Sequence, residues 1–499
     1  MKVKCLEEKL VDQTLLDLSK KFLSNSLDDV LNAISEKNYP DELKAILEAY
    51  NLRINNPITI EDNALFVVTG QQAGIFTGPL YTIYKIISCI NSAKKLSKEL
   101  KKPVHAVYWN ATEDHDLSEI VNCYLPGKHL RVNFNVNESA GEALSTKGLQ
   151  VFIDEFCAEL SIHFRDEVKS ILSVDFDAYG DYSSSLIAKL FKGHGLIILE
   201  PKILRPLNVE FYKKAVLKRA SIRQCLNESA DLLRSDSIDV PFTPSSGFGL
   251  FYINEKGHRR QIIEKNGDFI IDGEMKSEKE LLALIESKFR HFSTGAYLRP
   301  ILQAWLMPNP IYCAGPGELK YHLQLTGIYE LFDVKMPQIN LRNHATLLSS
   351  SEAKLLSLLD LSPEQIISGQ QRQYAKLELR DEWKKQFAHA KGHLESTTEI
   401  FDTSLVELAG DASLDRFREK LLHELNLLRR KAEREYKRQN EVDNFRVDRL
   451  YDVLFPVASK QERRINVFHF IAKEGPSLID KLIEVFDPNE DRHYWIEFD

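Results

Sequence analysis

Short apolar runs separated by helical patterns dominate the first two thirds of the chain. Residues 64–69 form one such run, which ends at Gly70, and residues 104–109 form a second run after Pro103. Runs of this length without strict alternation are typical of strands buried on both faces of a sheet. A glycine-rich turn and a helical pattern over residues 78–100 separate the two runs. This order predicts a βαβ unit with a right-handed crossover, and hence an α/β core built on a doubly wound parallel sheet.

Later apolar runs extend the predicted sheet. They occupy residues 195–199, 310–314 and 336–339. We therefore expect a Rossmann-like core over residues 61–372, preceded by a helical segment over residues 1–60 in which apolar positions recur at helical intervals. Two insertions interrupt the predicted core, at about 125–180 and 240–290. The second insertion has apolar runs between charged turns, which predicts a small β-rich region.

The pattern changes again after residue 372. Apolar positions then recur at intervals of three, four and seven within highly charged sequence. This spacing predicts two long helices that form an antiparallel coiled-coil arm over residues 373–445. Residues 446–499 return to globular composition, and we expect them to pack on the core.

Composition narrows the class of protein further. The 499 residues carry a formal net charge of −8, which does not suggest a nucleic-acid partner. Charges within the first nine residues argue against a secretory signal, and no apolar run approaches the roughly 18 residues that cross a bilayer, so no membrane partner is expected. The six cysteines are scattered and form no CxxC pair. They predict reduced thiols in a cytoplasmic protein and no metal site.

The first candidate site is the turn between the first two predicted strands. Glycines let the backbone approach a ligand closely, and the start of the following helix offers free N–H groups to an anion. The spacing matches neither the Walker pattern nor the dinucleotide-binding fingerprint, so a tight structural turn is an equally good interpretation. Lys85 is either a ligand for an anion or a solvated surface lysine. The candidate residues for binding a substrate or phosphate here are Gly70, Gln71, Gln72, Gly74, Thr77, Gly78, Tyr81 and Lys85.

The second candidate site follows the second predicted strand and reads Glu113-Asp114-His115-Asp116. Ligands of doubly wound sheets bind at the carboxyl ends of strands, so this cluster and the glycine turn are expected to face one crevice. His115 lies between carboxylates and is the candidate acid–base residue. Asp116 also fits a helix cap, because Glu119 follows it by three residues.

A third cluster lies around the fourth predicted strand. It contains Arg299 and Gln303, followed by Gly315 and Glu318 at the start of a helix. Glu318 either stabilises the N-terminus of that helix or binds a cationic amine. Both interpretations remain open from the sequence.

Taken together, these motifs resemble the cysteine-adding (BshC) family of bacillithiol biosynthesis. The motifs occur in the family's order and span residues 65 to 465. They are Val68-Thr69-Gly70-Gln71-Gln72, Phe76-Thr77-Gly78-Pro79-Leu80-Tyr81 with Lys85, Thr112-Glu113-Asp114-His115-Asp116, Arg299-Pro300 with Gln303, Gly315-Pro316-Gly317-Glu318, and Gln461-Glu462-Arg463. The chain departs from the family pattern at Ala73, at Leu341 before Arg342 and at Lys460, which leaves a related acceptor open.

The resemblance implies both an architecture and an activity. The architecture is a core like that of class I aminoacyl-tRNA synthetases, with connecting-peptide insertions and a coiled coil that mediates homodimerisation. The activity is that of a ligase, forming the amide bond between cysteine and the amino group of glucosaminyl malate in the last step of bacillithiol biosynthesis. Cysteine and glucosaminyl malate are therefore the expected substrates.

The chemistry of amide formation suggests roles for the candidate residues. Carboxylate oxygen is a poor leaving group, so cysteine has to be activated as an acyl phosphate or acyl adenylate. The sequence does not identify the cofactor and leaves ATP or another nucleotide open. We expect His115 to deprotonate the acceptor amine, Asp114 or Asp116 to bind the cysteine ammonium, and the glycine turn with Lys85 to hold an anionic group.

Two other classes of function remain open. The chain is alternatively a class I synthetase-like enzyme that activates an amino acid for another acceptor, in which case salt-sensitive tRNA binding is expected. It is also compatible with a non-catalytic coiled-coil dimer scaffold, for which His115→Ala would change no turnover.

Overall fold

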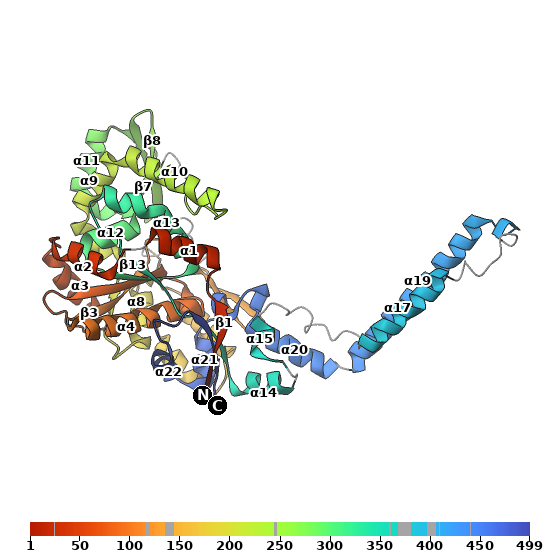
Figure 1. The fold of residues 1–499 in the computed structure, drawn as a ribbon. Coiled ribbons are helices and arrows are strands. Elements are labelled where there is room, and N and C mark those ends of the chain that lie inside the picture. Colours follow the sequence, from red (N-terminus) through yellow and green to blue (C-terminus); the bar gives the residue numbers. More distant parts are fainter. Residues whose placement is uncertain are drawn as a thin grey trace. The chain divides into compact units, whose positions relative to one another are not determined.

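The computed structural model describes residues 1–23, 25–114, 120–134, 144–243, 247–358, 361–367, 381–396, 406–408, 410–439 and 441–499 (Figure 1). The chain divides into two compact units. The first consists of Met1–Ser350 with Phe455–Asp499, and the second of Ser351–Leu454. Every described strand lies in the first unit, and the second unit is helical. The second unit therefore begins before residue 373, where the sequence pattern placed the start of the arm.

Five strands form the central sheet of the first unit. Neighbouring strands are parallel and follow the order β13-β12-β2-β3-β6. Each coincides with a predicted apolar run, which confirms the parallel α/β core. The strands are β2 (Leu65–Gln72), β3 (Val104–Ala111), β6 (Leu196–Leu199), β12 (Ile311–Ala314) and β13 (Gln338–Leu341).

Helices cover both faces of this sheet, as the continuous apolar runs require. On one face lies α4 (Leu80–Leu100), which joins β2 to β3 and places the Cys89 thiol 3.1 Å from the carbonyl oxygen of Val67. On the other face, Phe66 and Val68 pack into one large core. That core also contains buried residues of α3 (Glu42–Arg53), α9 (Val209–Leu217), α12 (Arg299–Leu306) and α13 (Pro316–Leu331).

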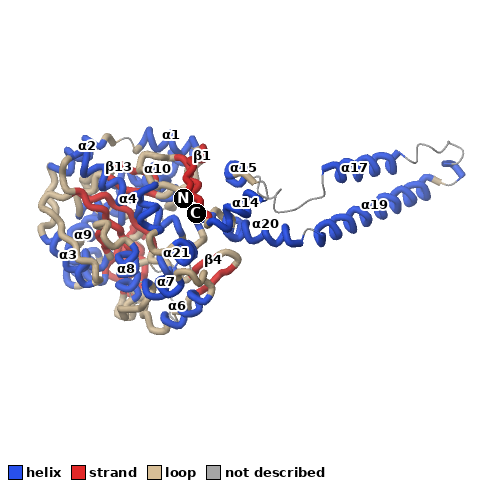
Figure 2. The backbone as a smooth tube through the Cα atoms, turned by 90° about the horizontal axis from the view of Figure 1, so that it is seen from below, coloured by secondary structure: helices blue, strands red, loops and turns tan. Residues whose placement is uncertain are grey.

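The N-terminal segment is only partly helical. Its helices are α1 (Gln13–Phe22), α2 (Leu27–Ser35) and α3. Residues 2–9, which we expected to be helical, form strand β1 (Lys2–Lys9). The reason is a long-range pairing, because β1 lies antiparallel to β15 (Arg492–Glu497), which in turn pairs with β14 (Ala345–Leu348). The two chain ends accordingly lie side by side in both views (Figures 1 and 2).

Two segments interrupt the order of the core strands. Between β3 and β6 lie the hairpin β4 (Asn122–Leu125) and β5 (Lys128–Arg131) and the helices α6 (Leu149–Ala158), α7 (Arg165–Ile171) and α8 (Tyr179–Leu190). Between β6 and β12 lies a five-stranded antiparallel sheet, which overlaps the predicted β-rich region at about 240–290. This sheet consists of β7 (Gly247–Ile253), β8 (Arg259–Lys265), β9 (Asp268–Ile271), β10 (Glu274–Lys276) and β11 (Phe292–Thr294), next to α10 (Arg219–Ser235) and α11 (Glu278–Ser287).

The second unit contains the predicted arm. Its two long helices are α17 (Asp381–Ser396) and α19 (Asp411–Gln439), which run side by side (Figure 2). Trp383 at the start of α17 meets Tyr436 near the end of α19, with ring centroids 5.4 Å apart. The two helices are therefore antiparallel, as predicted. The unit also contains all but the first residue of α14 (Ser350–Leu358), together with α15 (Pro363–Ile367) and α20 (Glu441–Leu454).

The chain returns to the first unit after the arm. This segment begins with short 3₁₀ turns, including Gln461–Arg463, and continues with α21 (Phe468–Glu474), α22 (Leu478–Val485) and β15. All six cysteines lie in described segments and are unpaired thiols. No helix in the described part of the chain is both long and apolar enough to cross a membrane.

Candidate functional site

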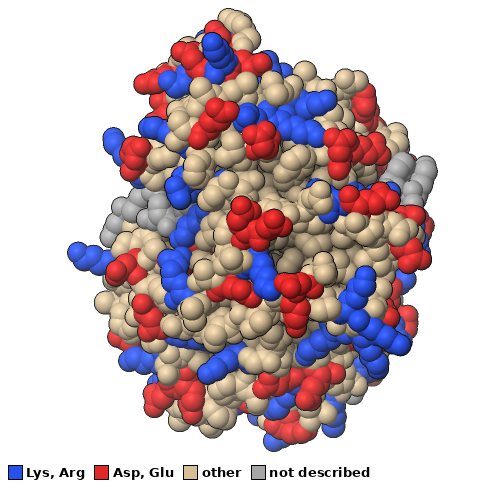
Figure 3. Space-filling model, turned by 90° about the vertical axis from the view of Figure 1, so that its left-hand side faces the viewer, with Lys and Arg blue, Asp and Glu red and all other residues tan. Residues whose placement is uncertain are grey.

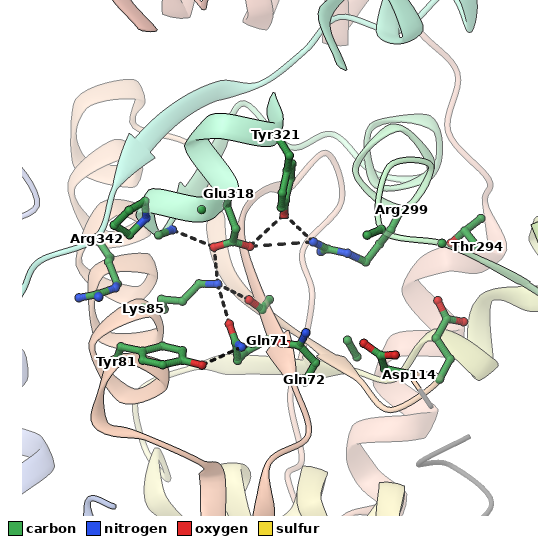
Figure 4. A pocket seen from close by; sticks show the side chains of 18 of the residues that line it. Gln71, Gln72, Tyr81, Lys85, Asp114, Thr294, Arg299, Glu318, Tyr321 and Arg342 are labelled. Atoms are coloured by element: carbon green, nitrogen blue, oxygen red, sulfur yellow. Dashed lines mark hydrogen bonds and ion pairs between the residues drawn. The ribbon is translucent and has the colours of Figure 1, made fainter. Parts of the chain in front are cut away.

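A cavity of about 580 Å³ lies where β2, β3 and β12 end (Figure 4). Residues 70–72 complete β2, residue 111 ends β3 and residues 113 and 114 follow it, and residues 315–318 follow β12. Ligands of doubly wound sheets bind at this edge, where strands give way to helices. The volume falls within the roughly 300–1,000 Å³ usual for small-molecule sites. The cavity is therefore the candidate site.

Lys85 is the centre of a polar cluster on one wall of the cavity (Figure 4). Its side chain, on the second turn of α4, is only 2% exposed. The ammonium forms an ion pair with Glu318 and donates a hydrogen bond to the carbonyl oxygen of Gly70, and its Nζ lies 3.2 Å from Oε1 of Gln71. A buried charge needs such partners. Lys85 is therefore a buried hub of the site, and the surface interpretation is wrong.

Glu318 joins this cluster to the start of α13. Its Oε1 accepts hydrogen bonds from the hydroxyls of Tyr312 at 2.6 Å and Tyr321 at 3.1 Å, and its Oε2 accepts from the backbone N–H of Gly315 at 2.8 Å. The bond to Gly315 closes the first turn of α13, so Glu318 does stabilise a helix N-terminus. Arg299 approaches the same carboxylate, at 3.9 Å.

The charges of this cluster compensate one another. Burial acts to raise the pKa of Glu318, but Lys85 and Arg299 outweigh that effect and hold the pKa at about 2. Burial lowers the pKa of Lys85, and the attraction of Glu318 opposes that change without cancelling it. The Glu318 carboxylate is thus ionised at neutral pH and already paired with cations of the protein. Such a carboxylate is poorly placed to bind a substrate amine.

Gly70 is required by close packing at the end of β2. A Cβ atom at this position would lie 3.1 Å from Nη1 of Arg299 and 3.1 Å from the carbonyl oxygen of Trp109. A side chain here would therefore require the arginine or the neighbouring backbone to shift by a few tenths of an ångström. The next two side chains, Gln71 and Gln72, both line the cavity, and Gln71 also donates a hydrogen bond to the hydroxyl of Tyr81 at 3.1 Å.

Glu113 and Asp114 line the cavity on the side of β3. The carboxylate of Glu113 lies 3.8 Å from Arg205, and that of Asp114 lies 4.0 Å from Arg259. Arg259 comes from the β-rich insertion and stacks on Phe251, with its guanidinium carbon 3.9 Å from the ring centroid. The insertion thus supplies part of the cavity wall.

The buried carboxylate of Glu200 anchors the segment that contains Glu113 and Asp114. The hydroxyl of Thr112 donates to Glu200 at 2.8 Å, and the hydroxyl of Tyr50 donates to the same side chain at 2.9 Å. Lys202 also pairs with Glu200, which is fully buried. These contacts fix the backbone immediately before Asp114.

The structure brings together only part of the predicted site. Nine predicted residues line the cavity, from three strand ends and three helices: Gly70, Gln71, Gln72, Tyr81, Lys85, Asp114, Arg299, Gly315 and Glu318. The candidate base His115 and its neighbour Asp116 lie outside the described residues, which stop at residue 114 and resume at residue 120.

The second half of the glycine turn, with Gly74, Thr77 and Gly78, lies outside the cavity lining. The side-chain amide of Asn466 donates to the carbonyl oxygens of Phe76 at 2.8 Å and Gly78 at 3.0 Å. Gly78 has φ = 69°, which glycine adopts without strain. These residues therefore build a structural turn that is braced by the C-terminal segment. Gln303 is also absent from the lining and is fully buried within α12.

Three arginines line the cavity that were not among the predicted site residues: Arg259, Arg342 and Arg463. Arg342 directly follows the end of β13, so the strand-end rule that selected Asp114 would have found it. Arg463 belongs to the Gln461-Glu462-Arg463 motif, which was singled out only through the resemblance. No sequence signal marks Arg259, because it lies in an insertion whose position over the cavity depends on tertiary packing.

No group of three or more His, Cys, Asp or Glu side chains within the described ranges is arranged to hold a metal ion. The cavity instead offers arginine, lysine, amide and tyrosine side chains, which suit an anionic organic ligand. Fold and site together define a Rossmann-like α/β protein with a polar strand-end cavity and a helical arm.

Comparison with known proteins identifies its family. Residues 16–343 match the N-terminal Rossmann-like domain of bacillithiol biosynthesis BshC, and residues 345–498 match its C-terminal coiled-coil domain. The chain belongs to the BshC family.

Relatives match along most of their length. One from Flavobacterium psychrophilum is 29% identical over 93% of this chain and 91% of its own, and one from Shouchella clausii is 30% identical over 87% and 84%. Both are named "Putative cysteine ligase BshC". A solved structure titled as a putative arginyl-tRNA synthetase from Campylobacter jejuni covers 85% of this chain and 99% of its own, at 10% identity and a TM-score of 0.23. A TM-score of that size does not establish a shared fold.

Proposed function

We propose that this protein is a ligase that joins the carboxyl group of cysteine to the amino group of glucosaminyl malate, in the last step of bacillithiol biosynthesis. The bond formed is a C–N amide bond. The names of the relatives support the ligase activity and the cysteine substrate. The acceptor is the finer part of the proposal, and the charge of the cavity supports it.

The observation that carries the proposal is the excess of cationic side chains in the cavity. Among the described lining residues, five side chains are cationic and three are carboxylates. The cationic ones are Lys85, Arg259, Arg299, Arg342 and Arg463, and the acidic ones are Glu113, Asp114 and Glu318. Such a cavity suits a small substrate that carries several carboxylates, because guanidinium groups pair with carboxylates in bidentate geometry. A malyl group carries two.

We propose a residue or segment for each of the three predicted roles, namely the base, the group that binds the ammonium and the group that binds an anion. The acceptor amine has to be neutral to attack, and His115 remains our proposed base, one residue beyond the cavity-lining Asp114. Asp114 or Asp116 is proposed to bind the cysteine ammonium. We propose that residues 70–72 hold the anionic group that we assigned to the glycine turn, and the absence of Gly74, Thr77 and Gly78 from the lining supports this choice. A nucleotide such as ATP would activate the cysteine carboxyl by transferring to it a phosphoryl group, with release of ADP, or an adenylyl group, with release of pyrophosphate.

The surface charge does not favour tRNA as the acceptor. On the face shown in Figure 3, the described Lys and Arg side chains are interspersed with Asp and Glu and form no continuous basic stripe. Such a stripe is the usual electrostatic footprint of nucleic-acid binding. A small acceptor therefore fits this face better than tRNA.

We further propose a cytoplasmic homodimer. Unpaired cysteines throughout the chain suit a reducing compartment. Helix α19 exposes the apolar side chains of Phe417, Leu427 and Leu428, which suit burial against a second arm.

The test is product analysis with the purified full chain. Cysteine, glucosaminyl malate and each nucleotide triphosphate are incubated with the protein, and the product is identified by mass spectrometry. We expect a product that contains both substrates, and its loss in a folded His115→Ala variant. Absence of product with every nucleotide would refute the ligase assignment. Product formation that persists in His115→Ala would refute only the role of His115.

A further inference from the structure

The segment that follows the arm reaches back into the candidate site. Glu462, in the 3₁₀ turn Gln461–Arg463, forms a bidentate pair with Arg342, with N–O distances of 3.0 and 2.7 Å. Both side chains are at most 3% exposed. Burial acts to raise the pKa of Glu462, but Arg342 outweighs it and holds the pKa at about 2. The pair is therefore ionised and fixed in one geometry.

Two neighbouring contacts hold this turn in place. The side-chain amide of Gln461 accepts from the N–H of Leu347 and donates to its carbonyl oxygen, both at 2.8 Å. Asn466 holds the glycine turn through its two hydrogen bonds to the carbonyl oxygens of Phe76 and Gly78. The segment before the arm, which contains Arg342 and Leu347, is thus bonded to the segment after it, which contains Gln461 and Glu462.

The donors of Arg342 are only partly used. An arginine has five N–H donors. Nη1 donates to Glu462 and to the carbonyl oxygen of Asn343, and Nη2 donates once, to Glu462. This leaves Nε–H and the second N–H of Nη2, which lie along one edge of the guanidinium. Among the described residues, the buried Nε has no hydrogen-bond partner.

The unused edge lies beside the cavity. Arg342 lines the cavity together with the turn that starts α13, and a Cβ atom on Gly315 would be 3.9 Å from Nε. Residues 315–318 at the start of α13 line the same wall, and the positive end of the helix dipole favours an anion there. An unpartnered buried donor is costly. A carboxylate bound there would satisfy both N–H groups of the edge at once.

We infer that Arg342 binds a carboxylate of the acceptor through this edge, and that Glu462 is the positioning residue that holds the guanidinium in that orientation. The inference rests on the proposed function and deepens it. The acceptor is the better occupant because its malyl carboxylates do not react and can serve as fixed handles. The carboxyl of cysteine has to stay open to activation and attack.

The test measures binding without turnover. L-malate is titrated into the full chain by calorimetry, for the wild type, Arg342→Lys, Glu462→Gln and the double variant. We expect each single variant to weaken malate binding by on the order of 10- to 100-fold, the range of a lost charge-assisted hydrogen bond. The double variant should be no weaker than Arg342→Lys, because Glu462 acts only through Arg342.

Two controls separate positioning from general damage. Glu490→Gln breaks another bidentate glutamate–arginine pair, with Arg492, and should leave malate affinity unchanged. The dimethyl ester of malate has no carboxylate, so wild type and Arg342→Lys should bind it equally weakly. If Glu462→Gln does not fold, Arg342→Lys still carries the test, since it keeps the charge and removes the guanidinium edge.

The outcomes separate this inference from the proposed function. Equal malate affinity in the wild type and Arg342→Lys, or no malate binding by the wild type, would overturn the inference. Malate binding that depends on Arg342 and Glu462 in a protein that forms no ligation product would support the inference while the ligase proposal fails.

Discussion

Replacing Lys85 by methionine removes the buried cation that faces Glu318 and keeps most of the side-chain volume. Among the described cationic side chains paired with Glu318, the change leaves Arg299, whose nitrogen lies 3.9 Å from the carboxylate. Breaking a buried ion pair by removing one partner typically costs about 3–5 kcal/mol, because the remaining charge stays desolvated. Lys85→Met should therefore destabilise the first unit strongly.

The shifted pKa of Glu318 gives an independent estimate of the effect. The pKa falls from its ordinary 4.5 to about 2. At about 1.4 kcal/mol per pKa unit, the surroundings of Glu318 favour its charged form by about 3 kcal/mol. Because the folded pKa is depressed, this contribution is present above pH 4.5 and is lost as the pH falls towards 2. Lys85→Met should raise that pKa and move the acid loss of stability to higher pH.

Guanidinium unfolding followed by tryptophan fluorescence measures the cost. We expect Lys85→Met to lower the free energy of unfolding by about 3 kcal/mol at pH 7. The double variant with Glu318→Gln should lose clearly less than the sum of the two single variants, because no unpaired charge remains. A single-variant loss within about 0.5 kcal/mol, the range of ordinary surface substitutions, would refute the buried-pair argument. Strict additivity in the double variant would refute it as well.

Three further predictions concern other parts of the molecule. Gly70→Ala should lower ligation and cost about 1–3 kcal/mol of stability, because its Cβ would press on Arg299 and the Trp109 carbonyl at 3.1 Å, whereas Gly317→Ala, with open space around it, should be tolerated in the same unfolding assay. Glu200→Gln should lower the rate of ligation by about tenfold, since it loosens the acidic segment of the cavity, and an unchanged rate in the mass-spectrometric assay would contradict that anchoring role. Phe417→Glu with Leu428→Glu should shift the protein towards monomer in sedimentation velocity, and an intact dimer would show that the arm does not hold the two copies together.

The parallel core could be predicted because its strands are buried on both faces. Such strands appear as continuous apolar runs, and the rule that ligands bind at strand ends then selected residues 70–72 and Asp114 for one crevice. Glu318 was marked as part of a separate cluster after the fourth run and was not assigned to that crevice. The rule does not say how many residues after a strand end still line the cavity. Gly74 and Gly78 follow the right strand, yet the turn that contains them packs against the C-terminal segment.

The rest of the site depends on pairings between distant segments. Local sequence cannot distinguish a buried lysine from a surface one when its partner, Glu318, lies more than 200 residues away. For the same reason the Arg342–Glu462 pair was not predicted, although each residue lies in a segment that the motifs or the strand pattern had marked. Strand β1 was missed because its partner, β15, lies at the other end of the chain.

Strand β2 and the turn after it contact segments that are synthesised much later, which has a consequence for folding on the ribosome. The hydroxyl of Thr69 in β2 donates to Cys313 in β12, 244 residues later, and Asn466 reaches Gly78 over 388 residues. At the usual 5–20 residues per second, one edge of β2 stays without its partner for roughly 10–50 s. An open strand edge invites wrong pairing with other chains. The nascent protein should therefore depend on chaperones until the segment that follows the arm emerges and supplies Arg463 to the cavity.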